Sequence, residues 1–167
     1  MNPGFHLQAD FLPPKIRGKV GTCEPRRRPL SDVSGALRNL GNLDLDAEHV
    51  RALCEQGILV AFNITAVSGV RRTLRVLTAS IDYFQANAGK LYHNPAWPEL
   101  LKLLIPHDRP VLTGLEIRYI LLCDRGHVEN LVKAGQLQAV KNSRPGPGGS
   151  WIITRESFEA FLKARKL

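Results

Sequence analysis

Long apolar runs are missing from this 167-residue sequence, and their absence limits the classes of protein it can belong to. The longest runs, at residues 58–62 and 119–123, fall far short of the roughly 18 to 20 residues that span a bilayer. The first ten residues also lack a charged segment followed by an apolar one, so they do not indicate a secretory signal. We therefore expect a cytoplasmic protein with no membrane partner.

Cysteine is scarce, and the sequence contains no Cys-x-x-Cys pair: Cys23, Cys54 and Cys123 lie far apart. The five histidines are dispersed as well and make no metal-ligand spacing with one another or with the cysteines. No Ser/His/Asp set, paired-carboxylate site or Cys/His dyad can be assembled from residue spacing. We expect reduced thiols, no metal site, no cofactor, no small-molecule substrate and no enzymatic activity.

Acidic and aromatic residues are both few. The 23 Lys and Arg outnumber the 15 Asp and Glu, which gives a formal net charge of +8 and an isoelectric point near 9.8. This excess favours a polyanionic partner or an anionic membrane surface. Because aromatic residues make up only 7% of the chain, an RNA-binding protein that stacks bases on aromatic rings is disfavoured. Nucleic acid is therefore the leading partner at this point.

Residues 1–29 form a basic arm rich in helix breakers. They contain five prolines and three glycines, end close to the run Arg26, Arg27 and Arg28, and carry a net charge of +4. Two interpretations stay open for this arm. It is either a solvated tail or a segment that contacts DNA or a partner and becomes ordered on binding.

The rest of the chain contains a repeated unit. Residues 49–59 match residues 127–137, 78 positions later, at a His, a Val, two Leu and a Gly. Residues 74–84 match residues 151–161, 77 positions later, at a Ser and a Phe. Self-similarity of this kind indicates a duplication. We therefore expect four segments: a basic Pro/Gly-rich arm at 1–29, a first unit at 30–89, a linker helix at 90–110 and a second unit at 111–167.

Each copy has the same predicted order of elements. Ser31 and Thr113 are expected to cap a first helix, and Gly57 and Gly135 to end a second helix in the left-handed conformation. The second helices are predicted at about 46–55 and 125–133. A β-hairpin follows, with strands at 60–67 and 73–77 in the first copy and at 138–141 and 150–153 in the second. A last helix begins at a Thr or Ser cap.

The segment between the copies predicts a short apolar helix over residues 99–105, closed by Pro106. Trp97 precedes this helix, and we interpret it as an anchor for the linker rather than as a ligand-stacking aromatic.

The order helix, turn, helix, Gly-x-Leu, hairpin and helix resembles the excisionase/MerR-type winged helix-turn-helix family, a small DNA-binding module. The second copy, with its segments 112–117, 127–140 and 150–162, resembles the family more closely than the first. The resemblance implies a mostly helical α+β protein with two tandem winged helix-turn-helix domains. It also implies a double-stranded DNA-binding protein: a transcriptional regulator or an excisionase-like accessory factor in DNA recombination of a mobile element. Association with the nucleoid follows from that function.

A helix of about ten residues fits the major groove, and the tip of a wing reaches flanking DNA. In the second copy the candidate DNA-binding residues of the second helix are Arg125, His127, Glu129, Asn130 and Lys133. Those of its wing are Lys141, Asn142 and Arg144. In the first copy the candidates are His49, Arg51, Arg71 and Arg72, with Arg75 as a further basic residue of that wing. The arm adds Arg26, Arg27 and Arg28.

The two copies differ in charge, and this leaves an alternative open. Residues 30–89 carry a net charge of −1, whereas residues 111–167 carry +4. The first copy therefore either contacts DNA through its wing alone or binds its twin or another DNA-bound protein. The alternative function is a protein-interaction adaptor that uses degenerate winged helices to bind another regulator or a recombinase. It predicts binding to a partner that is insensitive to salt, and negligible affinity for DNA.

Overall fold

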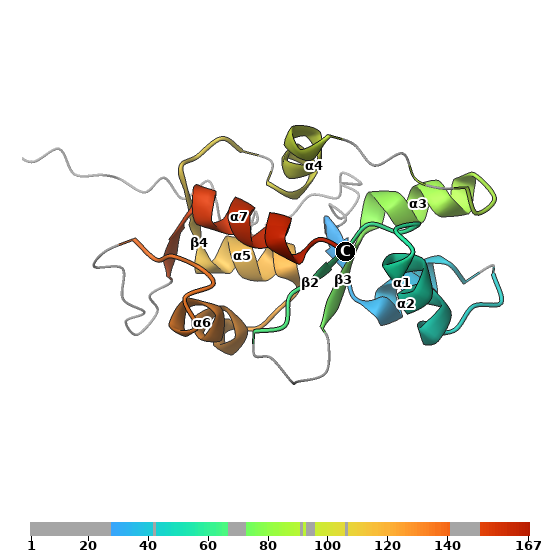
Figure 1. Ribbon diagram of the computed structural model, residues 1–167, viewed down its shortest axis with the longest axis horizontal. Coiled ribbons are helices and arrows are strands. Elements are labelled where there is room, and N and C mark those ends of the chain that lie inside the picture. Colours follow the sequence, from blue (N-terminus) through green and yellow to red (C-terminus); the bar gives the residue numbers. More distant parts are fainter. Residues whose placement is uncertain are drawn as a thin grey trace, which may run out of the picture.

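The computed structural model describes residues 28–41, 43–66, 73–90, 92, 96–105, 107–140 and 151–167. The elements are mostly helices with short strands, so the predicted mostly helical α+β class is confirmed. One end of the molecule in Figure 1 holds α1 (Val33–Asn39), α2 (Ala47–Glu55) and α3 (Thr78–Ala86). The other end holds α5 (Gly114–Leu121), α6 (Arg125–Lys133) and α7 (Arg155–Arg165). Helix α4 (Trp97–Leu104) comes from the stretch between the repeats.

Each unit has a small antiparallel sheet. The first unit contains β1 (Leu30–Ser31), β2 (Ala61–Asn63) and β3 (Leu74–Leu77), with β3 in the middle. The second contains β4 (Val111–Thr113) and β5 (Ile152–Thr154), which pair with Leu112 opposite Ile153. Figure 1 shows β2 and β3 between the two groups of helices.

The strands before α1 and α5 were not predicted, and β1 changes the cap of α1. Ser31, the predicted cap, lies in β1 opposite Val76. The next residue, Asp32, caps the helix instead, and its carboxylate accepts a hydrogen bond from the Gly35 amide at 2.6 Å. Thr113 caps α5 as predicted, since its hydroxyl accepts from the Glu116 amide.

The predicted Thr or Ser cap is present on α7 and absent from α3. Thr154 caps α7, whereas the residue before α3 is Leu77, which makes no side-chain cap. The Thr78 hydroxyl donates to the Arg28 carbonyl at 2.9 Å, and the Ser80 hydroxyl donates to the Leu77 carbonyl at 2.7 Å. Both hydroxyl groups are therefore bonded away from the amides at the start of the helix.

The second helices and their ends agree with the sequence prediction. Helices α2 and α6 lie within one residue of the predicted bounds. Gly57 and Gly135 follow them with φ of +71° and +69°, the left-handed region that favours glycine. Of the strand predicted at 138–141, residues 138–140 are described, and there Ala139 forms an isolated bridge with Ile153.

One buried apolar cluster extends through both units and the linker. It includes Phe62 and Leu77 from the first sheet, Leu104 from α4, and Leu131 and Phe158 from the second unit. Trp97 packs against this cluster, so its interpretation as a linker anchor is confirmed. A second cluster lies among α1, α2 and α3. The two repeats therefore share an interior, and α4 is part of it.

Candidate nucleic-acid interface

The start of α5 is fixed by a capping box. The Glu116 carboxylate accepts hydrogen bonds from the amide and the hydroxyl of Thr113 at 2.7 and 2.9 Å. Its other oxygen, Oε1, lies 3.1 Å from His107 Nε2 and pairs with Arg109. The Glu116 side chain is only 18% exposed, so this carboxylate holds the linker end against α5 from a largely buried position.

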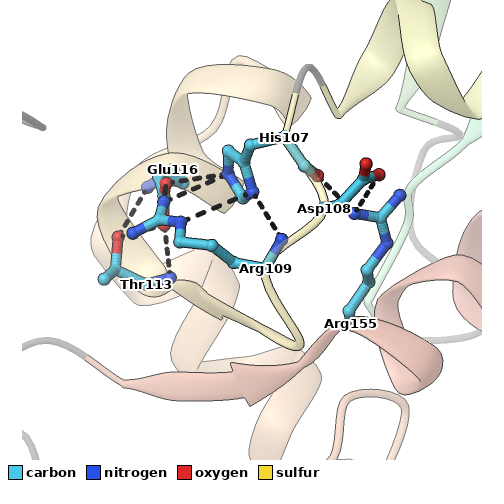
Figure 2. Close-up of polar contacts among 6 residues, drawn as sticks. All are labelled: His107, Asp108, Arg109, Thr113, Glu116 and Arg155. Carbon is cyan, nitrogen blue, oxygen red and sulfur yellow. Dashed lines mark hydrogen bonds and ion pairs between the residues drawn. The ribbon is translucent and has the colours of Figure 1, made fainter.

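Figure 2 shows a second contact of the same linker segment, made by Arg155 at the start of α7. The Arg155 guanidinium donates to the His107 carbonyl and lies 3.6 Å from the Asp108 carboxylate. It also donates to Glu159 at 2.6 Å. The charges in this region are therefore paired within the protein. These pairs fix the end of the linker against the starts of α5 and α7.

Helix α6 presents a polar face to solvent. Its cap is Asp124, which accepts from the His127 amide at 2.7 Å, and its inner side buries Val128 and Leu131. The exposed residues of α6 are Arg125, Gly126, Asn130 and Lys133. Glu129 is half-buried and pairs with Lys133 at 3.1 Å. Of the five α6 residues predicted to bind DNA, four thus lie on one outward side.

His127, the fifth, lies between the two units. Its Nε2 atom is 2.8 Å from the Ile64 carbonyl oxygen just after β2. Beyond the other end of α6, Gln136 Nε2 donates to the Ala66 carbonyl at 3.0 Å. These contacts hold α6 against the first unit at both ends, and they direct the imidazole away from the exposed face.

The matching residue in the first unit has a different environment. His49 Nδ1 lies 2.9 Å from the Asp46 carboxylate in a solvent-exposed capping box of α2. The backbone amide of His49 is the main cause that lowers the pKa of Asp46. Arg51 pairs with Glu48 on the same helix. The start of α2 is therefore acidic and internally paired, and it lacks the cationic face of α6.

The other candidates lie in the arm and the wings. Arg28 is exposed, and its guanidinium lies 5.2 Å from the centroid of the Tyr119 ring. The rest lie outside the described residues: Arg26, Arg27, Arg71, Arg72, Lys141, Asn142 and Arg144.

Arg75 has a contact that the sequence analysis missed. Its Nε donates to the Leu121 carbonyl at 2.7 Å, and its Nη2 donates to the Leu122 carbonyl at 2.7 Å. The side chain is half-buried on β3, with buried Leu74 and Val76 on either side. The alternation along this strand places Arg75 on the opposite face, but it does not reveal that the second unit covers that face.

The described thiols are protected from solvent to different degrees. Cys54 is buried and Cys123 is half-buried, and burial raises the pKa of each thiol to about 11. Within the described part of the chain, no three His, Cys, Asp or Glu residues come together as a metal site. None of the helices in the described ranges has the length and apolarity needed to cross a membrane.

No protein-family model matches this chain, and comparison with curated proteins and with solved structures gives no significant match.

Proposed function

We propose that this protein binds double-stranded DNA, with α5 and α6 as a winged helix-turn-helix pair and α6 in the major groove. The observation that carries the proposal is the outward face of α6, where Arg125, Asn130 and Lys133 are all exposed. A rigid helix with such a face is the part of a helix-turn-helix that contacts base edges.

The chemistry of this face suits DNA. The amide of Asn130 can make a pair of hydrogen bonds with adenine, and the Arg125 guanidinium can do the same with guanine or bind a phosphate. Lys133 is suited to phosphate as a point charge. Glu129, which pairs with Lys133 in the free protein, can accept a hydrogen bond from cytosine. The face therefore has groups for base recognition and for backbone binding.

Charge supports the second unit as the DNA-binding part. It carries +4 over residues 111–167, whereas the first unit carries −1 and begins α2 with the exposed carboxylates of Asp44, Asp46 and Glu48. A phosphate backbone would be repelled by that helix start. We infer that the first unit supports the DNA-binding helix rather than reading DNA with α2. A role in transcription regulation or DNA recombination, at the nucleoid, agrees with this activity.

The test is fluorescence anisotropy of a labelled, mixed-sequence 30-base-pair duplex from about 50 to 300 mM salt. Lys133→Ala is expected to weaken binding and to lower the salt slope by about 1, because one phosphate contact is lost. Asn130→Ala is expected to relax selection at one base pair.

Lys102→Ala is the matched control for this test. Lys102 is an exposed lysine of α4, and Figure 1 shows α4 on the side of the second unit away from α6. The Lys102→Ala variant should bind DNA with the affinity of the wild type. Equal losses in the two lysine variants would contradict α6 as the contact surface. Absence of binding at low salt would favour the adaptor function, and a partner pull-down would then follow.

A further inference from the structure

The turn between α5 and α6 contains a leucine in a conformation that favours glycine. Leu122 follows the last residue of α5 with φ 51° and ψ 49°, in the left-handed region. A side chain makes this conformation unfavourable because Cβ crowds the following carbonyl oxygen. The chain uses Gly57 and Gly135 for the same purpose after α2 and α6. The turn at Leu122 therefore depends on stabilisation from its surroundings.

Arg75 supplies that stabilisation from the other unit. Its guanidinium donates to the carbonyls of Leu121 and Leu122, both at 2.7 Å, while Nη1 donates to the Leu74 carbonyl at 2.9 Å. The last carbonyls of a helix lack partners within the helix, and a cation at this end also interacts favourably with the helix dipole. A single side chain of β3 thus holds two successive carbonyls of the turn.

The position of α6 depends on this turn. Its cap, Asp124, comes two residues after Leu122, so the backbone of the turn sets the angle at which α6 leaves α5. His127 and Gln136 then fasten α6 to residues 64 and 66 of the first unit. The first unit therefore fixes the turn before α6, the first turn of α6 and the residues just after its end.

We propose that Arg75 is a positioning residue for DNA binding, through which the first unit completes the turn of the helix-turn-helix and orients α6. This inference rests on the proposed function. All three guanidinium nitrogens of Arg75 hold backbone carbonyls, so its role is to shape the protein rather than to contact a phosphate.

The test compares wild type, Arg75→Lys, Leu122→Gly and the double variant as full-length chains, with the labelled 30-base-pair duplex as the probe. Arg75→Lys keeps the charge and removes the planar fork, and we expect about 10-fold weaker binding. Leu122→Gly should bind within about twofold of wild type, because glycine adopts the turn without strain. The double variant should recover to within about threefold of wild type, since the two changes are coupled. Arg38→Lys, at an exposed arginine of α1, is the matched control and should bind like wild type.

Two results would overturn this role for Arg75. One is an Arg75→Lys variant that binds DNA with wild-type affinity. The other is an Arg75→Lys variant that binds weakly and is not restored by adding Leu122→Gly, which is expected if Arg75 contacts DNA directly or has only a general folding role. If the thermal midpoint of Arg75→Lys lies below the assay temperature, adding Leu122→Gly is expected to raise the midpoint of the double variant above the assay temperature. A double variant that stays unfolded would contradict the proposal. Absence of DNA binding by wild type would overturn the proposed function, and this role with it.

Discussion

The imidazole of His127 on α6 lies 2.8 Å from the carbonyl oxygen of Ile64, which follows β2 in the other unit. The neighbouring backbone is covered in the same way, because the Ala66 carbonyl accepts from Gln136 and the Ala61 carbonyl accepts from the Leu167 amide at 2.9 Å. Unpaired backbone groups on an edge strand are a template for pairing with other chains. In this protein the C-terminal end of the second unit covers part of the outer edge of β2 at Ala61, and His127 and Gln136 cover the backbone just after the strand.

His127→Ala is expected to affect stability more than DNA binding. The substitution leaves the Ile64 carbonyl without its side-chain partner, which should lower the free energy of unfolding by about 1–2 kcal/mol. Urea denaturation measures this loss, and anisotropy should show a smaller effect on affinity than Lys133→Ala. His49→Ala, whose exposed imidazole pairs with Asp46, should cost less than about 0.5 kcal/mol. Equal losses in stability for the two histidine variants would contradict the role of His127.

Phe62→Ala is expected to destabilise both units together. Phe62 is completely buried in the cluster that joins the units, and its truncation should cost about 3–5 kcal/mol. The two tryptophans of the chain, Trp97 and Trp151, lie in the linker and the second unit, so their fluorescence reports the unfolding of those parts. The fluorescence and circular-dichroism midpoints should fall together. A shift in circular dichroism alone would indicate that the units unfold independently.

Glu116→Gln tests the contacts of the linker segment with α5. The neutral amide loses the charge that faces Arg109 and His107 and one acceptor of the capping box, so the free energy of unfolding should fall by about 2–3 kcal/mol. Glu99→Gln, at an exposed carboxylate of α4, should change stability by less than about 0.5 kcal/mol. Thermal melts of the two variants at pH 7 provide the comparison, and similar midpoints would disprove this role for Glu116.

Cys54 predicts a loss of stability at alkaline pH. Burial raises the pKa of its thiol from 9.0 to about 11 in the folded protein, so folding favours the neutral form. The resulting stabilisation is present below pH 9 and disappears as the pH rises towards 11. Between pH 8 and 11 the wild type should lose about 2 kcal/mol more than Cys54→Ala, in which this group is absent. Urea denaturation at the two pH values measures the difference, and identical pH profiles would exclude this linkage.

The local elements were predictable because their signals are local. Apolar spacing together with Gly57 and Gly135 predicted the bounds of α2 and α6. Thr113 and Thr154 are the caps of α5 and α7, as their positions directly before these helices indicated. The strands β1 and β4 were missed because two or three residues carry no periodic pattern of their own. They form only because a partner strand lies beside them. For β1 that partner is β3, in which Leu77 lies opposite Leu30.

The contacts between the units could not be predicted from the sequence. His49 and His127 occupy equivalent positions in the repeat, yet one caps its own helix and the other reaches Ile64. Their difference depends on which surface lies next to each helix, and periodicity within a unit does not contain that information. The same holds for Arg75, whose basic character suggested DNA while its neighbours in space are backbone carbonyls.

The shared edge of β2 has a consequence for assembly. The second unit occupies the place that a separate subunit takes in a dimer, and both sides of the contact are tethered within one chain. A tethered contact does not dissociate on dilution, because the local concentration of its partner is set by the chain and not by the solution. Held in this way, α6, the helix that we propose binds DNA, keeps its orientation at protein concentrations where a dimer of separate units would have come apart.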